Sequence, residues 1–162
     1  MKTTILSIAP ELYSTKIAIS ENEKIIYESE IIHAPDELIL CENTMEQMPL
    51  RRDAIMSHLR KDNVDIKSIQ YITAEGGLLR PCKSGVYTID KKMVCDLIEG
   101  IAGDDVINLG GLLAFTIANS LGIRSLVVDP LSVDERSELA AFSPHIPLKK
   151  KSLFHVMIHK YL

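Results

Sequence analysis

The stretch TTILSIAPELYSTKIAISENEKIIYESEIIH, residues 3–33, decides the fold of this chain. It contains three runs rich in β-branched and other apolar residues, at 3–9, 16–20 and 24–33. Runs of this kind, bounded by turn residues, are typical of β-strands, and the short polar connection at 21–23 suits a hairpin. The stretch therefore predicts three consecutive strands joined by tight turns, which is an antiparallel meander.

Two helical segments are predicted after the meander. Residues 35–47 begin with Pro-Asp-Glu, and both proline and acidic side chains suit the first turn of a helix. Residues 50–61 carry apolar residues at helical spacing, with arginines and lysines on the other faces. A strand is expected next, over residues 68–73, and it leads to the glycine pair Gly76-Gly77.

Helices and strands alternate in the second half of the chain. Asp90 is a good N-cap for a helix that runs to about Glu99. A strongly apolar helix is expected over residues 108–121, stopped by Gly122, and a β-branched strand over residues 124–128. This strand–helix–strand order predicts parallel pairing late in the sheet.

Length, composition and charge indicate a globular protein. The chain has 162 residues, of which 46% are hydrophobic and 25% charged, and this suits one folded domain. The net charge of −4 gives no reason to expect nucleic acid or an anionic membrane as partner. No run approaches the roughly 18–20 apolar residues that span a bilayer, and no signal peptide is recognisable, so a cytoplasmic location is expected. Three cysteines without Cys-x-x-Cys spacing predict neither a disulfide framework nor a zinc site.

Five sequence blocks carry a resemblance to a known family. The first is similar to the opening of butyrate kinases, where a strand runs into an Asn-Pro-Gly-Ser-Thr-Ser-Thr-Lys loop. The other four follow in family order, and together the blocks cover essentially the whole chain. They are ILSIAPELYSTKIAI at 5–19, AEGGLLRPCKSGVYTID at 74–90, NLGGLLAFTIANSLGI at 108–123, VVDPLSVDE at 127–135 and KSLFHVMIHKY at 151–161. The chain thus resembles the N-terminal domain of the butyrate kinase and acetate kinase family, the acetokinases.

This resemblance implies a fold and a reaction. The expected fold is an α/β domain of the ribonuclease-H-like type, shared with actin-like ATPases, in which an antiparallel meander is followed by parallel strands and helices. The expected organisation is one acetokinase-like N-terminal domain over residues 1–162, with the C-terminal nucleotide-binding domain of the family absent. Family members transfer a phosphoryl group between ATP, with Mg, and a short-chain carboxylate to give an acyl phosphate, in a cleft between the two domains.

The resemblance also assigns site residues. Phosphate or substrate binding is predicted for Ser14, Thr15, Lys16, Gly76, Gly77 and Asn108. Catalytic roles are predicted for Asp129, His155 and His159. No metal site is predicted in this chain. For Asp129 a second interpretation stays open, because Asp-Pro after a strand is also a common way to start a turn.

Several positions that face phosphate in the family have changed in this chain. Glu11 replaces the loop glycine, and Leu12 and Tyr13 replace two hydroxyl residues. Glu75 stands where the family has its catalytic arginine, and Asp105 where it has a histidine. Phosphoryl transfer depends on positive charge around the transferred group, so carboxylates at these positions work against it.

These departures predict a kinase-like domain without kinase activity as this chain alone, and without a cofactor of its own. One alternative is half of a split carboxylate kinase, completed by a separate C-terminal domain. Another is a binding or interaction module. A ribonuclease-H-like nuclease is disfavoured, because the first strand lacks the acid that two-metal catalysis needs. The expected partner is a second copy of the chain, with the apolar segment 153–158 buried in a homodimer, or a complementary C-terminal-domain chain.

Overall fold

Three antiparallel strands open the fold, as the sequence predicts. In the computed structural model, which describes residues 2–134, they are β1 (Thr4–Pro10), β2 (Ser14–Glu21) and β3 (Lys24–Ile32). All seven residues of β1 pair with β2, from Thr4 opposite Glu21 to Pro10 opposite Thr15. Asn22 turns the β2–β3 hairpin with a φ of 53°, a conformation that asparagine tolerates better than most residues.

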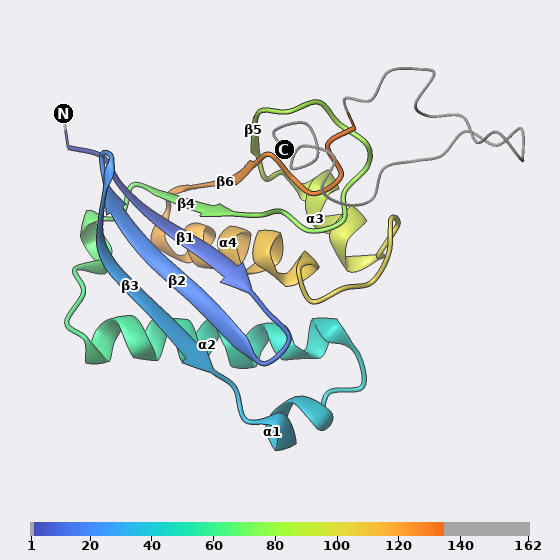
Figure 1. The fold of residues 1–162 in the computed structure, drawn as a ribbon, viewed down its shortest axis with the longest axis horizontal. Coiled ribbons are helices and arrows are strands. Elements are labelled where there is room, and N and C mark those ends of the chain that lie inside the picture. Colours follow the sequence, from blue (N-terminus) through green and yellow to red (C-terminus); the bar gives the residue numbers. More distant parts are fainter. Residues whose placement is uncertain (1, 135–162) are drawn as a thin grey trace, which may run out of the picture.

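The strands that follow extend the sheet on the other side of β1. Strand β4 (Tyr71–Ala74) is parallel to β1, and β6 (Arg124–Val128) is parallel to β4. The short strand β5 (Val86–Thr88), which the sequence did not predict, pairs antiparallel with β6. The order is β3-β2-β1-β4-β6-β5, as Figure 1 shows. The mixed sheet of the predicted α/β fold is confirmed.

Two predicted elements differ from the structure. The expected helix over 35–47 is wrong: it is divided into α1 (Pro35–Ile39) and a 3-10 turn (Thr44–Glu46). The division has a local cause, since the side chain of Asn43 accepts a hydrogen bond from the Glu46 amide and so starts a new helical turn. The expected strand over 68–73 begins only at Tyr71, because residues 66–68 form a 3-10 turn capped by Asp65.

The other predicted helices are confirmed. Helix α2 (Gln47–Lys61) begins at Gln47, three residues before Leu50, where the sequence predicts its start. Asp90 caps α3 (Lys91–Ile98) by accepting from the Met93 amide at 2.8 Å. Helix α4 (Asn108–Leu121) ends at Gly122, which adopts the left-handed conformation with φ 69°.

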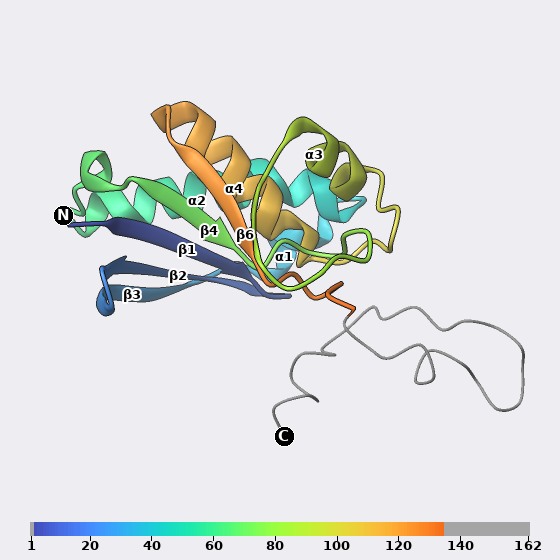
Figure 2. The ribbon, with the colours of Figure 1, turned by 90° about the horizontal axis from the view of Figure 1, so that it is seen from above.

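Helices α2 and α4 cover one face of the sheet, and α3 packs on α4 (Figure 2). Between sheet and helices lies a core of fully buried aliphatic side chains: Leu6, Ile8, Ile17, Ile55, Leu59, Ile72, Leu109, Leu113, Ile117 and Val127. Within residues 2–134 no helix covers the opposite face of the sheet (Figure 2). No helix in this part of the chain has the length and apolar character needed to cross a membrane.

Residues 135–162 lie outside the described part of the chain. The predicted catalytic residues His155 and His159 fall there, as does the apolar segment 153–158. The predicted organisation as one domain over 1–162 therefore stays a prediction.

Candidate functional site

The carboxyl ends of the parallel strands β1, β4 and β6 meet at one edge of the sheet. Ile8 pairs with Ala74, and Ala74 with Val127, so the segments that leave these strands lie side by side. Helix α4 begins at the same edge, since a Cβ added to Gly110 would lie 3.3 Å from Pro10. In open α/β sheets, ligands bind outside the carboxyl ends of parallel strands. The predicted site residues of the described chain gather around this edge.

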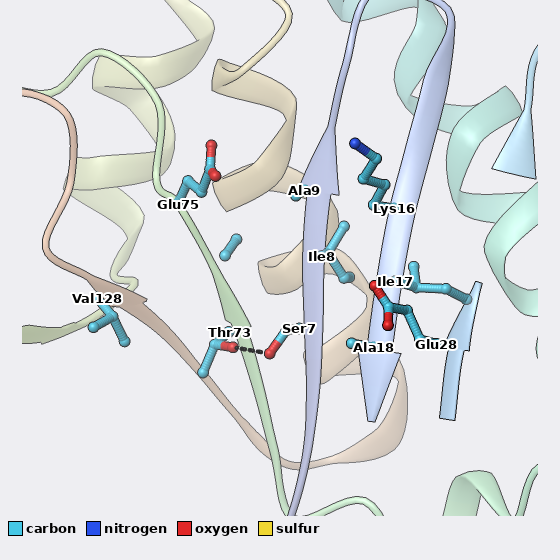
Figure 3. A pocket seen from close by; sticks show the side chains of 11 residues that line it. Ser7, Ile8, Ala9, Lys16, Ile17, Ala18, Glu28, Thr73, Glu75 and Val128 are labelled. Carbon is cyan, nitrogen blue, oxygen red and sulfur yellow. Dashed lines mark hydrogen bonds between the residues drawn. The ribbon is translucent and has the colours of Figure 1, made fainter. Parts of the chain in front are cut away.

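An open hollow of about 280 Å³ lies on the helix-free face next to this edge. Its lining comes from the five neighbouring strands β3, β2, β1, β4 and β6 and from the start of the segment after β4: Ser7, Ile8, Ala9, Lys16, Ile17, Ala18, Glu28, Thr73, Ala74, Glu75 and Val128 (Figure 3). The hydroxyls of Ser7 and Thr73 are 3.0 Å apart and join β1 to β4 across its floor. The amino group of Lys16 and the carboxylate of Glu75 both extend toward the carboxyl end of β1 (Figure 3).

Lys16 is held by an acid of its own loop. Its Nζ lies 2.6 Å from Oε1 of Glu11, and the hydroxyl of Ser14 donates to the other carboxylate oxygen at 3.3 Å. The bond to Lys16 lowers the pKa of Glu11, and the same bond, with Glu30 and Glu28 nearby, raises the pKa of Lys16. Both side chains are about half exposed, so the pair adds little stability. An anionic ligand, however, would have to compete with Glu11 for Lys16.

Thr15 faces the core and not the hollow. Successive side chains of a strand point to opposite faces, so Thr15 lies with Ile17 on the side of the helices, and it is fully buried. Its hydroxyl accepts from Nη1 of Arg51 at 3.0 Å and lies 2.8 Å from Nε2 of His33. Of the three predicted loop residues, only Lys16 therefore lines the hollow.

Sequence reasoning missed Arg51 and His33, which are 0% and 3% exposed. The expectation that the arginines of this helix all lie away from its apolar face is wrong for Arg51. A signal was available: Arg51 precedes Ile55 and Leu59 at steps of four, which places it on the buried face of α2. Burial, together with the charge of Arg51, lowers the pKa of His33 to about 4.

Gly77 and Asn108, both predicted to bind phosphate or substrate, lie against each other, but the side-chain amide of Asn108 is used inside the protein. Its Oδ1 accepts from the Leu78 amide at 2.8 Å, and its Nδ2 donates to the carbonyl of Gly103 at 2.8 Å. A Cβ on Gly77, whose φ is 73°, would lie 2.6 Å from Cα of Asn108. These residues fasten the segment after β4 to the start of α4.

The acids around the site have different surroundings. Asp129, with φ 43°, accepts from the Gly85 amide at 2.7 Å and donates its own amide to the Gly85 carbonyl. This geometry suits the turn interpretation of Asp129. Asp105 accepts from the amide of Ile107 at the entry to α4, and Glu75 is exposed. Among the described residues, no three His, Cys, Asp or Glu side chains are close enough together to hold a metal ion.

Comparison with known proteins finds butyrate kinases among the proteins to which this chain is similar. Butyrate kinase 2 of Clostridium acetobutylicum is 40% identical over 160 residues, which is 99% of this chain and 45% of the relative. A probable butyrate kinase of Listeria monocytogenes is 37% identical over the same share of each chain. The chain is thus similar to an N-terminal part of acetokinases. It spans less than half the length of these relatives, and no family model matches it.

Solved acetokinases share the fold. Acetate kinases from Porphyromonas gingivalis and Entamoeba histolytica each superpose with a TM-score of 0.55 over 98% of this chain, at 14% identity. They are matched over 43% and 45% of their own lengths. The likeness confirms the predicted ribonuclease-H-like architecture of the acetokinases.

The described residues at the strand ends lack the free positive charge and free polar groups that a nucleoside triphosphate requires. The one loop cation that lines the hollow, Lys16, is already paired with Glu11. Glu75 adds a carboxylate at the edge where the resemblance implies a guanidinium. The side-chain polar atoms of Thr15 and Asn108 form hydrogen bonds within the protein. No step of phosphoryl transfer can therefore be assigned to these side chains.

Proposed function

We propose that this chain is a carboxylate-kinase-like domain that does not transfer a phosphoryl group by itself. The contact between Glu11 and Lys16 carries the proposal. It places a carboxylate on the amino group that would otherwise attract phosphate, and the carboxylate belongs to the position where the family loop has glycine. Phosphoryl transfer relies on fixed positive groups around the transferred phosphate, and here that charge is neutralised within the loop.

The acids at Glu75 and Asp105 support the same conclusion. In other enzymes, removing a single group that stabilises transition-state charge slows catalysis roughly 100- to 1000-fold. A reversal of charge at the arginine position is a larger change than a removal, because it adds repulsion. A family reaction that uses ATP and Mg is therefore not expected from this chain alone.

The test is an activity and binding assay on the purified chain. We expect no acyl phosphate from ATP, Mg and butyrate or acetate, and no heat of ATP binding by calorimetry, under conditions in which an active full-length butyrate kinase gives both. Turnover that is lost on Asp129→Ala would refute the proposal. A Glu11→Gly, Glu75→Arg double variant should gain measurable affinity for inorganic phosphate, and an unchanged affinity would show that these acids are not the cause.

A second candidate is half of a split carboxylate kinase. The match to butyrate kinase 2 favours this function, because it covers 45% of that relative, and a second chain could supply the part that is not matched. Kinase activity that appears only when a C-terminal acetokinase domain is added would establish this function, and no activity in the mixture would exclude it for the domain tested.

A second copy of this chain is the other partner that we propose. A homodimer should be visible by light scattering at micromolar concentration and should be lost in a truncation that ends at Lys150. A monomer in both samples would exclude the dimer.

A further inference from the structure

Arg51 is a buried cation that grips the β1–β2 loop from inside the protein. Its Nη1 donates to the carbonyl of Ser14 at 2.7 Å, and its Nη2 donates to the carbonyl of Leu12 at 3.0 Å. Its Nε and Nη2 both donate to Oε1 of Gln47, one turn earlier in α2, at 3.1 and 2.9 Å. With the bond to Thr15, the guanidinium is saturated by neutral acceptors.

This arrangement is costly for the protein. A buried charge is expensive unless it is paired or fully hydrogen-bonded, and the described residues give Arg51 no carboxylate partner. Burial accordingly lowers the pKa of Arg51. The rigid fork of a guanidinium can reach several carbonyls at once, which an ammonium cannot. The bonds to Leu12 and Ser14 are therefore what the burial of this charge achieves.

His33 completes the grip from the neighbouring strand. Its amide donates to the carbonyl of Tyr13 at 2.9 Å, between the two carbonyls that Arg51 holds. Because the Thr15 hydroxyl accepts from Arg51, its own proton is free to bond Nε2 of His33, which requires a neutral ring. Three consecutive backbone carbonyls are thus fixed: those of positions 12 and 14 by the buried Arg51, and that of position 13 by the main-chain amide of His33.

We propose that Arg51 is the positioning residue of the candidate site: it sets the backbone of the β1–β2 loop from the core, and the contact of Glu11 with Lys16 on the outside depends on it. The loop is then preformed without any ligand. This inference does not rest on the proposed lack of kinase activity, because the same grip would position the loop whether or not phosphate binds.

Amide hydrogen exchange measured residue by residue tests the proposal. The amides of Glu11 and His33 are bonded at the gripped end of the meander, to Ser14 and Tyr13, whereas the Asn22 amide is bonded to Thr3 at the opposite end. In Arg51→Met, exchange at positions 11 and 33 should be at least 10-fold faster, with position 22 unchanged. The pKa of Glu11, now lowered, should return toward 4.5.

The matched control is Arg52→Met, the same change at the next residue of α2. Arg52 is partly exposed and paired with Asp53, so its loss should leave all three amides unchanged. Equal acceleration at positions 11, 33 and 22, or none, would overturn the proposal, because Arg51 would then contribute only to global stability.

If Arg51→Met does not fold, Thr15→Val and Gln47→Ala each remove one of the acceptors of Arg51 and leave the rest in place. Each should accelerate exchange at positions 11 and 33 more than at position 22. A uniform response in both variants would overturn the proposal as well.

Discussion

Replacing Asn108 by alanine tests whether this residue serves the fold or a ligand. The side chain is fully buried and makes two hydrogen bonds of 2.8 Å, one to the Leu78 amide and one to the Gly103 carbonyl. Each of the two partners left without a bond costs about 1–3 kcal/mol, so we expect Asn108→Ala to lower the free energy of unfolding by about 2–6 kcal/mol. For a chain of this size that corresponds to a fall in Tm of roughly 4–24 °C.

Urea and thermal denaturation followed by circular dichroism would measure this loss. Asn108→Asp is an informative partner variant, because its carboxylate can still accept from the Leu78 amide but has no proton to donate to Gly103. It should also destabilise the protein. If both variants unfold like the wild type, the bonds do not hold the segment after β4, and the prediction of Asn108 as a phosphate or substrate ligand becomes the better interpretation.

Three further predictions concern stability and charge. Gly77→Ala should cost at least 2 kcal/mol more in chemical denaturation than Gly122→Ala, because both have positive φ but only the first would meet neighbouring atoms, at 2.6 Å; equal costs would contradict the packing. The pKa of His33 is about 4 in the folded protein, whereas in the unfolded chain His33 binds a proton below pH about 6.5. The free energy of unfolding should therefore fall as the pH drops from about 6.5 toward 4, by up to about 3 kcal/mol relative to His33→Gln. Parallel pH profiles of the two proteins would contradict this prediction. Glu11→Gln should lower the pKa of Lys16, measured by NMR, without a measurable change in stability. An unchanged pKa of Lys16 would show that Glu11 and Lys16 are not paired in solution.

Much of the fold is predictable because it is encoded locally. Runs of β-branched residues predict the strands at 3–9 and 24–33. The apolar sequence over 108–121 and the glycine that follows it predict the helix there. Strand β5 has only three residues and no pattern of its own, so it becomes a strand only by pairing with β6. The break after α1 depends on the side chain of one residue, Asn43, which a helical pattern over 35–47 conceals.

The place of the candidate site was predictable, but the direction of its side chains was not. Residues that follow parallel strands must meet at one edge, which brings Gly76 and Asp129 near the β1–β2 loop. Whether Thr15 faces a ligand or the core depends on which face of the sheet the helices cover, and the local sequence does not state this. The burial of Arg51 is likewise a tertiary fact, although its spacing to Ile55 hinted at it.

The grip on the β1–β2 loop has a consequence for protein engineering. Arg51 and the His33 amide hold main-chain oxygens, which every amino acid possesses, so the grip is indifferent to the side chains at positions 11–13. Those three positions can in principle be randomised without removing any acceptor on which the turn depends. The protein thus offers a short display turn at the end of two strands, which Arg51 and His33 hold by its main chain and not by the displayed side chains.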